Sequence, residues 1–321
     1  MMNAPAYAPG IEDYKRICAE IDPPDFYRHS YFNQRSFYLD LFRAFPIPRP
    51  RSVHVRDDAL VLADHQIPLR IFRRHDAGDA LTPCIIYAHG GGFINGNLEA
   101  SDSIAADLAD RLRLTVITLH YRLAPEYRHP AALEDCYSTL EWIAERGDAL
   151  YRIDPRRILF AGESCGGNFA AAVALLSRDR NGPKLFGQVP INPIFDLHRW
   201  AFWEATEYPQ DAQVEMNHYT HHYLNGQRDY MKCYASPLLA DSLEDLPPAF
   251  LWAAECDPLA DEARAFAARL AAARVPCELH IEKGVVHGCL RARRHYGFAA
   301  RGFENLVSGI ARLLALSFAL V

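Results

Sequence analysis

The sequence lacks the features that mark membrane, secreted or nucleic-acid-binding proteins. No uninterrupted apolar run approaches the ~18 residues of a membrane span, and the first residues lack the basic start and apolar stretch of a secretory signal. The net charge of −6 comes without a basic block, which disfavours nucleic acid and anionic membrane surfaces as partners. We therefore expect a cytoplasmic protein without stable membrane association that acts on a small molecule, and a homodimer is compatible with this reading.

The cysteines also exclude two classes of protein. The eight cysteines contain no C-x-x-C pair, and they stand at positions 18, 84, 136, 165, 233, 256, 277 and 289. Such scatter is typical of reduced, buried thiols rather than of a disulfide framework or a zinc site. We expect neither a metal nor a cofactor. With 50% hydrophobic and 23% charged residues, the 321-residue chain has the composition of one large globular domain with an appendage.

Apolar strand patterns alternate with helical patterns along most of the chain, which predicts an α/β fold with a mostly parallel sheet covered on both faces. After a hairpin over 53–56 and 67–72, strands are expected at 84–89, 114–120, 157–162, 187–191, 249–254 and 277–282. Helices are expected at 101–112, 131–146, 167–178, 260–273 and 301–318.

Two aromatic-rich stretches interrupt this alternation. Residues 1–50 are partly helical in pattern and end in prolines at 46, 48 and 50, and residues 195–232 carry aromatic residues where the alternation lapses. We expect a cap built from 1–50 and from an insertion at 195–232, above a core formed by 51–194 and 233–321.

A glycine loop follows the first buried strand. Residues 89–92 read His-Gly-Gly-Gly directly after the apolar run 84–88. Three successive glycines do not stabilise a core, but they let backbone N–H groups approach a ligand without obstruction by a Cβ atom. An oxyanion is the ligand that such a loop suits.

A nucleophile is predicted downstream of this loop. Residues 162–166 read Gly-Glu-Ser-Cys-Gly between a buried strand and an alanine-rich helix. This is the G-x-S-x-G turn, in which Ser164 takes strained backbone angles so that its hydroxyl projects. The pattern alone is weak, because a glycine-rich turn is a common structural feature, but the strand before it and the helix after it are those that the mechanism requires.

An activated serine also needs a base and an acid, which follow it in that fold in the order acid, then histidine. Asp257 follows the strand 249–254, and His287 follows the strand 277–282 in a glycine-flanked loop. Each has rivals. For the acid these are Glu255, Asp261 and Glu262, the latter two of which also suit a helix N-terminus, and for the base they are His280 and His295.

Five motifs, in this order, resemble those of the bacterial hormone-sensitive-lipase-like esterases, a branch of the α/β-hydrolase fold. They are 89–93 (His-Gly-Gly-Gly-Phe), 121–126 (Tyr-Arg-Leu-Ala-Pro-Glu), 162–168 (Gly-Glu-Ser-Cys-Gly-Gly-Asn), 257–262 (Asp-Pro-Leu-Ala-Asp-Glu) and 287–288 (His-Gly). The resemblance implies an α/β-hydrolase core with a helical cap.

The resemblance also implies roles for single residues. Ser164 would be the nucleophile, His287 the base and Asp257 the acid, and the backbone N–H groups of Gly91, Gly92 and Cys165 would form the oxyanion hole. The chain departs from the family where Glu163 and Cys165 replace an aspartate and an alanine. Because only the backbone of residue 165 is used, the cysteine should not abolish catalysis.

We therefore expect a serine carboxylesterase acting on short- to medium-chain acyl esters. One alternative is an arylformamidase-like amidase, a lactonase or a carbamate hydrolase with the same triad, and another is a non-catalytic receptor on the same fold. Arg122 is interpreted as a structural guanidinium rather than a substrate contact. The histidines at 218, 221 and 222 are interpreted as part of an amphipathic cap helix rather than as metal ligands.

Overall fold

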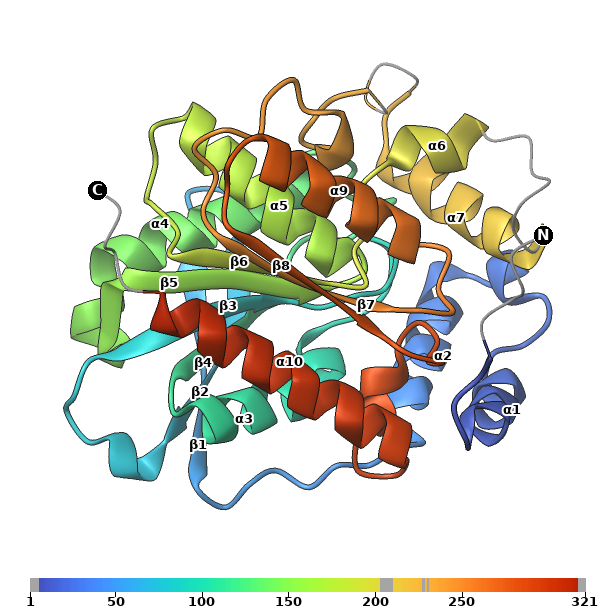
Figure 1. The fold of residues 1–321 in the computed structure, drawn as a ribbon, viewed down its shortest axis with the longest axis horizontal. Helices are drawn as coiled ribbons and strands as arrows, with labels where there is room; N and C mark the ends of the chain where they lie inside the picture. The colour runs from blue at the N-terminus through green and yellow to red at the C-terminus, as the bar shows by residue number, and fades with distance from the viewer. Residues whose placement is uncertain (1–5, 203–209, 227–228, 230, 317–321) are drawn as a thin grey trace.

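A single eight-stranded sheet runs through the molecule (Figure 1). The structure is a computed structural model that describes residues 6–202, 210–226, 229 and 231–316. The strand order is β1-β2-β4-β3-β5-β6-β7-β8, and only the β1–β2 and β2–β4 pairs are antiparallel. The strands are β1 (Val53–Val61), β2 (Gln66–Arg74), β3 (Thr82–Ala88), β4 (Thr115–Leu119), β5 (Ile153–Glu163), β6 (Gly187–Ile191), β7 (Ala249–Ala254) and β8 (Cys277–Glu282).

Helices cover both faces of the sheet, as the α/β reading predicts. One face packs against α3 (Leu98–Leu112) and α10 (Gly297–Ala315), and the other against α4 (Ala131–Tyr151), α5 (Cys165–Asp179) and α9 (Ala260–Ala272) (Figure 1). All residues of β4, β6 and β7 are buried, and β7 accordingly reads as a continuous apolar run rather than as an alternating one. The fold expected from the sequence is confirmed.

Further helices gather at one end of the sheet (Figure 1). The N-terminal segment forms α1 (Ile11–Ile21), η1 (Phe26–Arg28) and α2 (Tyr31–Arg43), and the chain between β6 and β7 forms α6 (Leu197–Phe202), α7 (Gln210–Tyr223) and η3 (Pro237–Leu239). Two other short helices of the described residues are η2 (His75–Ala77) and η4 (Cys289–Ala292). Residues 1–5, 203–209, 227–228 and 230 of the expected cap, and 317–318 of the expected last helix, lie outside the described residues. The division into cap and core stays a prediction.

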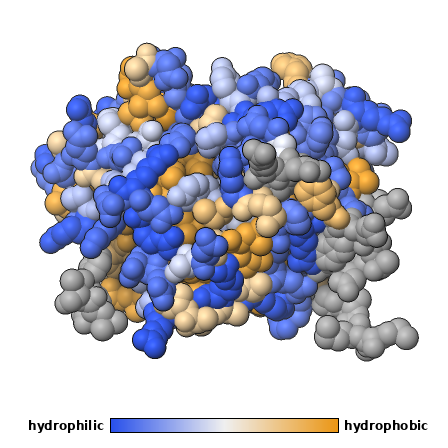
Figure 2. Space-filling view, turned by 90° about the horizontal axis from the view of Figure 1, so that it is seen from above, coloured by the Kyte–Doolittle hydropathy of each residue, from blue (hydrophilic) through white to orange (hydrophobic). Residues whose placement is uncertain are grey.

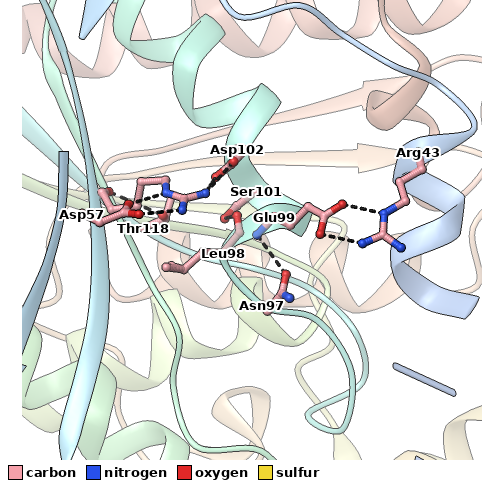
Figure 3. Close-up of polar contacts among 9 residues, drawn as sticks. Arg43, Asp57, Asn97, Leu98, Glu99, Ser101, Asp102 and Thr118 are labelled. Atoms are coloured by element: carbon pink, nitrogen blue, oxygen red, sulfur yellow. Dashed lines mark hydrogen bonds and ion pairs between the residues drawn. The ribbon is translucent and has the colours of Figure 1, made fainter. Parts of the chain in front are cut away.

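Arginines of α2 join the N-terminal segment to the core near the glycine loop. Arg43 forms an ion pair with Glu99 in the first turn of α3, where the side chain of Asn97 accepts the Glu99 N–H (Figure 3). Arg35 pairs with Glu126 and donates to the carbonyl oxygen of Ile94 at 2.9 Å. Exposed ion pairs contribute only about 0–1 kcal/mol each, so these contacts fix the position of α2 more than they stabilise the fold.

Polar side chains dominate the surface over α4, α5 and α9, with apolar surface showing between them (Figure 2). Among the described residues, no helix combines the length and apolar character needed to cross a membrane. All eight cysteines are free thiols, and Cys84, Cys136, Cys165 and Cys289 are buried.

Candidate active site

Ser164 occupies a strained turn between β5 and α5. Its backbone angles are φ 59° and ψ −117°, which a residue with a side chain rarely adopts. The backbone N–H of Ser164 donates to the carbonyl oxygen of Ile191 in the neighbouring strand at 2.8 Å, and its carbonyl oxygen accepts the N–H of Asn168. The turn is therefore held from both sides, as the G-x-S-x-G pattern predicts.

The glycines on either side of the serine are required by close backbone approach. A Cβ atom on Gly162 would lie 2.4 Å from the backbone of Gly166, and one on Gly166 would lie 2.1 Å from the carbonyl oxygen of Ala88. Both distances are shorter than any real contact, so only glycine lets β3, β5 and α5 meet at this point. The turn consequently lies beside the end of β3, where the glycine loop begins.

The glycine loop follows β3 and bends sharply. Gly91 has φ 122° and Gly92 has φ 61°, in the region that favours glycine. A Cβ on Gly91 would lie 2.3 Å from the carbonyl oxygen of Asn95, and one on Gly92 would lie 2.3 Å from the ring of Tyr219. A Cβ on Gly90 would lie 3.4 Å from the Cβ of Ser164, so the loop and the nucleophile are neighbours.

His89 and Tyr121 support the loop from inside the protein. Their rings stack at 4.3 Å, and the Tyr121 hydroxyl donates to the carbonyl oxygen of His89 at 2.8 Å. Burial lowers the pKa of His89 to about 3, so the ring is neutral. Its Nδ1 lies 2.8 Å from the carbonyl oxygen of Gly90, which can only accept, so we assign the ring proton to Nδ1. His89 therefore shapes the loop and is not a base.

Asp257 and His287 meet at the carboxyl ends of β7 and β8. The Asp257 Oδ2 lies 2.5 Å from the Nδ1 of His287, and its Oδ1 accepts the N–H of Leu259 at 3.0 Å. Only 2% of the Asp257 side chain is exposed. Burial disfavours a charge on the imidazole, but the carboxylate of Asp257, with smaller contributions from Glu163 and Glu215, outweighs this and raises the pKa of His287 to about 9.

The structure has Glu163, whose carboxylate contributes to the raised pKa of His287, directly before Ser164 at the end of β5. Among the described residues it records no hydrogen bond between the Ser164 hydroxyl and His287. Such contacts are often long in unliganded enzymes and tighten when substrate binds.

The rival residues have other partners. His280 contacts Glu282 at 2.9 Å, and His295 contacts the carbonyl oxygen of Pro46. Among the rival acids, Glu255 pairs with Lys283, and Asp261 is an exposed partner of Arg264. Glu262 is buried and accepts N–H groups from Phe195, Asp196 and Trp200, which ties α9 to the start of the insertion. The geometry therefore favours Asp257 and His287.

Glu163 and Cys165, the two residues that differ from the family pattern, have side chains that point into the protein. The Cys165 thiol is buried under the loop, 3.6 Å from the Tyr121 hydroxyl, and burial raises its pKa. The Cys165 side chain therefore contacts Tyr121, one of the two residues that support the glycine loop. One carboxylate oxygen of Glu163 is buried without a hydrogen-bond partner, while the Arg291 guanidinium attracts this carboxylate from a longer distance.

Two residues near the site were missed by the sequence reasoning. Tyr219 and Glu215 lie one turn apart on α7, and the ring of Tyr219 rests against Gly92. No motif marks them. The only available signal was their i, i+4 spacing, which places both on one face of the helix.

Two other sequence interpretations can be compared with the geometry. Arg122 donates to both oxygens of Asp135, from its side chain and its backbone, which confirms the structural interpretation. His218 lies 3.2 Å from Gln34, and His222 contacts the carbonyl oxygen of His218. Within the part of the chain that the structure describes, no cluster of three or more His, Cys, Asp or Glu is arranged to hold a metal.

Comparison with known proteins gives consistent matches. A family model described as the alpha/beta hydrolase fold matches residues 85–291. The chain is 32% identical over 298 residues to an arylesterase of Saccharolobus solfataricus, covering 89% of this chain and 93% of that protein. It is 36% identical over 228 residues to the carboxylesterase NlhH of Mycobacterium tuberculosis, covering 69% and 70%.

Solved structures of esterases have the same fold as this chain. The hyperthermophilic esterase of Pyrobaculum calidifontis superimposes with a TM-score of 0.82 at 28% identity, covering 96% of this chain and 99% of that one. Because the matches extend over most of the chain, they are not confined to the short motifs. The chain therefore belongs to the hormone-sensitive-lipase-like family of the α/β-hydrolase fold.

Proposed function

We propose that this chain is a serine carboxylesterase in which Ser164 is the nucleophile, His287 the general base and Asp257 the acid that orients it. His287 takes the proton of the Ser164 hydroxyl as the oxygen attacks the ester carbonyl, and then protonates the leaving alcohol. The resulting acyl-enzyme is hydrolysed by water. The N–H groups of Gly91, Gly92 and Cys165 stabilise the oxyanion of each tetrahedral intermediate.

The observation that carries the proposal is the contact between the buried carboxylate of Asp257 and the imidazole of His287, in a chain that also holds Ser164 in a strained turn. A carboxylate 2.5 Å from Nδ1 keeps the proton on that nitrogen, so Nε2 is free to accept the serine proton. The relatives agree, since they are named arylesterase, carboxylesterase and ethyl acetate hydrolase.

Substrates with short to medium acyl chains suit a site beneath a cap. The rate should be measured on aryl esters from acetate to laurate, with an anilide and N-formylkynurenine for comparison. We expect kcat/KM to be highest for acetate to octanoate. If a formyl amide were hydrolysed faster than every ester, the chain would be assigned instead as an amidase with the same triad.

Covalent labelling separates the enzyme from a receptor on the same fold. An organophosphonate should inactivate the protein with one equivalent bound, and digestion followed by mass spectrometry should place the adduct on Ser164. A protein that binds esters but fails to react would be a receptor without an activated serine.

Replacement of Gly92 by alanine is expected to lower kcat strongly without unfolding the protein. The new methyl group would lie 2.3 Å from the Tyr219 ring at a backbone φ of 61°, so the loop must move and its N–H donor with it. Loss of one oxyanion donor reduces kcat by ~10²–10³-fold. The measurement is kcat on a short aryl ester, with circular dichroism to check the fold.

Gly78 offers a matched control for this substitution. It has φ 54°, and nothing lies within 4 Å of the Cβ position, so Gly78→Ala introduces similar backbone strain without a clash. The Gly78→Ala variant should keep its activity. Equal losses in both variants would mean that backbone strain, rather than the oxyanion loop, explains the result at Gly92.

Activity is expected to rise with pH up to the alkaline range. The imidazole must be neutral to accept the serine proton, and its pKa in the folded protein is about 9. Therefore kcat/KM should be low at neutral pH, increase through the pKa of His287 and then level off. A profile from pH 6 to 10.5 in buffers of constant ionic strength tests this, and a plateau already reached at pH 7 would contradict it.

A further inference from the structure

Helix α2 of the N-terminal segment brings a tyrosine hydroxyl to the nucleophile turn. A Cβ atom on Gly90, the first glycine of the loop after β3, would lie 3.2 Å from the Oη of Tyr38 and 3.4 Å from the Cβ of Ser164. The Tyr38 hydroxyl and the Ser164 side chain therefore approach the same point beside the loop. Because residue 90 is a glycine, no side chain of the loop separates them at that point.

A cation and a second aromatic ring hold the Tyr38 ring. The guanidinium carbon of Arg291 in η4 lies 6.0 Å from the centroid of the Tyr38 ring and 4.8 Å from that of Phe42, which itself packs edge-on against Tyr38 at 5.4 Å. The Nε of Arg291 donates to the carbonyl oxygen of Gly288 at 3.0 Å. Because Gly288 directly follows His287, one arginine contacts both the loop that holds the base and the ring of Tyr38.

The Tyr38 hydroxyl differs from those of its neighbours in having no hydrogen-bond partner among the residues that the structure describes. The Tyr121 hydroxyl donates to the carbonyl oxygen of His89 at 2.8 Å, and the Tyr14 hydroxyl donates to that of Gly288 at 3.0 Å. Burial raises the pKa of Tyr38 far above its ordinary value, so the phenol keeps its proton and can donate it. The hydroxyl is thus a donor and an acceptor available to a bound molecule.

The proposed catalytic groups are accessible to such a molecule. Ser164 is half-buried, and 38% of the His287 side chain is exposed. An ester that reacts with Ser164 has its carbonyl carbon against the Ser164 hydroxyl oxygen. Groups next to the scissile bond then lie in the region that the Tyr38 hydroxyl approaches.

We propose that Tyr38 is a specificity-determining residue whose hydroxyl hydrogen-bonds a polar group that the ester carries next to the scissile bond. This inference rests on the esterase function proposed above. The substrate class is an ester with a hydroxyl or carbonyl substituent on the acyl or the alcohol side of that bond. An apolar substituent in the same place would leave the Tyr38 hydroxyl without a partner, which disfavours binding.

Two pairs of esters of nearly equal size test this proposal. Ethyl lactate, assayed as each enantiomer, has a hydroxyl where ethyl isobutyrate has a methyl group, on the acyl side. Hydroxyethyl acetate and propyl acetate differ in the same way on the alcohol side. Within a pair, the ratio of kcat/KM for the polar ester to that for the apolar ester does not depend on the concentration of active enzyme. Comparing one ratio between two proteins also cancels the intrinsic reactivity of the esters.

The ratio should fall about threefold to tenfold in Tyr38→Phe for the pair whose polar group contacts Tyr38. The pair that responds shows whether this group lies on the acyl or the alcohol side. Unchanged ratios in both pairs would overturn the proposal. Because no described residue bonds the hydroxyl, we expect Tyr38→Phe to fold. Tyr38→Leu also lacks the hydroxyl, carries the same expectation and replaces Tyr38→Phe if that variant is insoluble.

Tyr31→Phe is a matched control. It makes the same chemical change on the same helix, at a ring that packs against His222 of α7. Both ratios should keep their wild-type values in this variant, and falls equal to those in Tyr38→Phe would refute the proposal. Failure of the esterase function itself would look different, because the wild-type protein would then hydrolyse none of these esters and would not be labelled at Ser164.

Discussion

Replacing Ser164 by alanine is expected to abolish ester hydrolysis, with kcat falling by about 10⁶-fold. The substitution removes the only atom that forms the acyl-enzyme in the proposed mechanism, so no later step can compensate. The oxyanion loop and the Asp257–His287 pair remain, and such remnants give only a residual rate above that of the uncatalysed reaction. The measurement is kcat on a short aryl ester at alkaline pH, using a protein preparation that is free of contaminating wild-type enzyme.

A serine of the helix that follows Ser164 provides a control for a purely structural loss. Ser177 is buried in α5, and its hydroxyl donates to the carbonyl oxygen of Pro183 at 2.7 Å. Ser177→Ala should cost about 1 kcal/mol of unfolding free energy and leave kcat near the wild-type value. If Ser164→Ala retained more than about one hundredth of the activity, far above the residual level that such mutations leave, another nucleophile would have to be sought.

Burial on both faces leaves a continuous apolar run in β7, whereas the edge strand β8 is only partly buried and alternates polar and apolar residues; both patterns could be recognised in the sequence. The strands predicted at 187–191, 249–254 and 277–282 have the observed bounds of β6, β7 and β8. Helix ends were less certain where glycines occur. Helix α4 continues to Tyr151 rather than ending at 146, so Gly147 lies inside it, and α5 begins at Cys165 rather than at 167, so two glycines lie in its first turn.

The residues proposed as catalytic could be selected from the sequence because each follows a recognisable strand. Ser164, Asp257 and His287 all follow core strands, and the carboxyl ends of parallel strands meet at one edge of a sheet. Glu215 and Tyr219 could not be predicted. Their position depends on how α7 lies across the oxyanion loop, a tertiary contact that leaves no pattern in the local sequence.

Replacing Asp257 by asparagine is expected to lower kcat by about 10⁴-fold while the protein stays folded. An amide in this position can present its NH₂ group to the imidazole, which favours the tautomer with its proton on Nε2, and it no longer stabilises the imidazolium. Because burial alone lowers the pKa of His287, loss of the carboxylate should also move the alkaline rise in kcat/KM to lower pH. The full pH profile measures both effects, and the low activity should persist at every pH.

A neighbouring aspartate separates this role from a general effect of negative charge. Asp261 is 60% exposed and lies four residues after Asp257, at the start of α9, where it was a rival for the same role. Asp261→Asn makes the same chemical change but leaves the contact between Asp257 and His287 intact, so its kcat and pH profile should match those of the wild-type protein. If Asp261→Asn lost as much activity as Asp257→Asn, the 2.5 Å contact would not be what orients the base, and the assignment of the acid would have to be withdrawn.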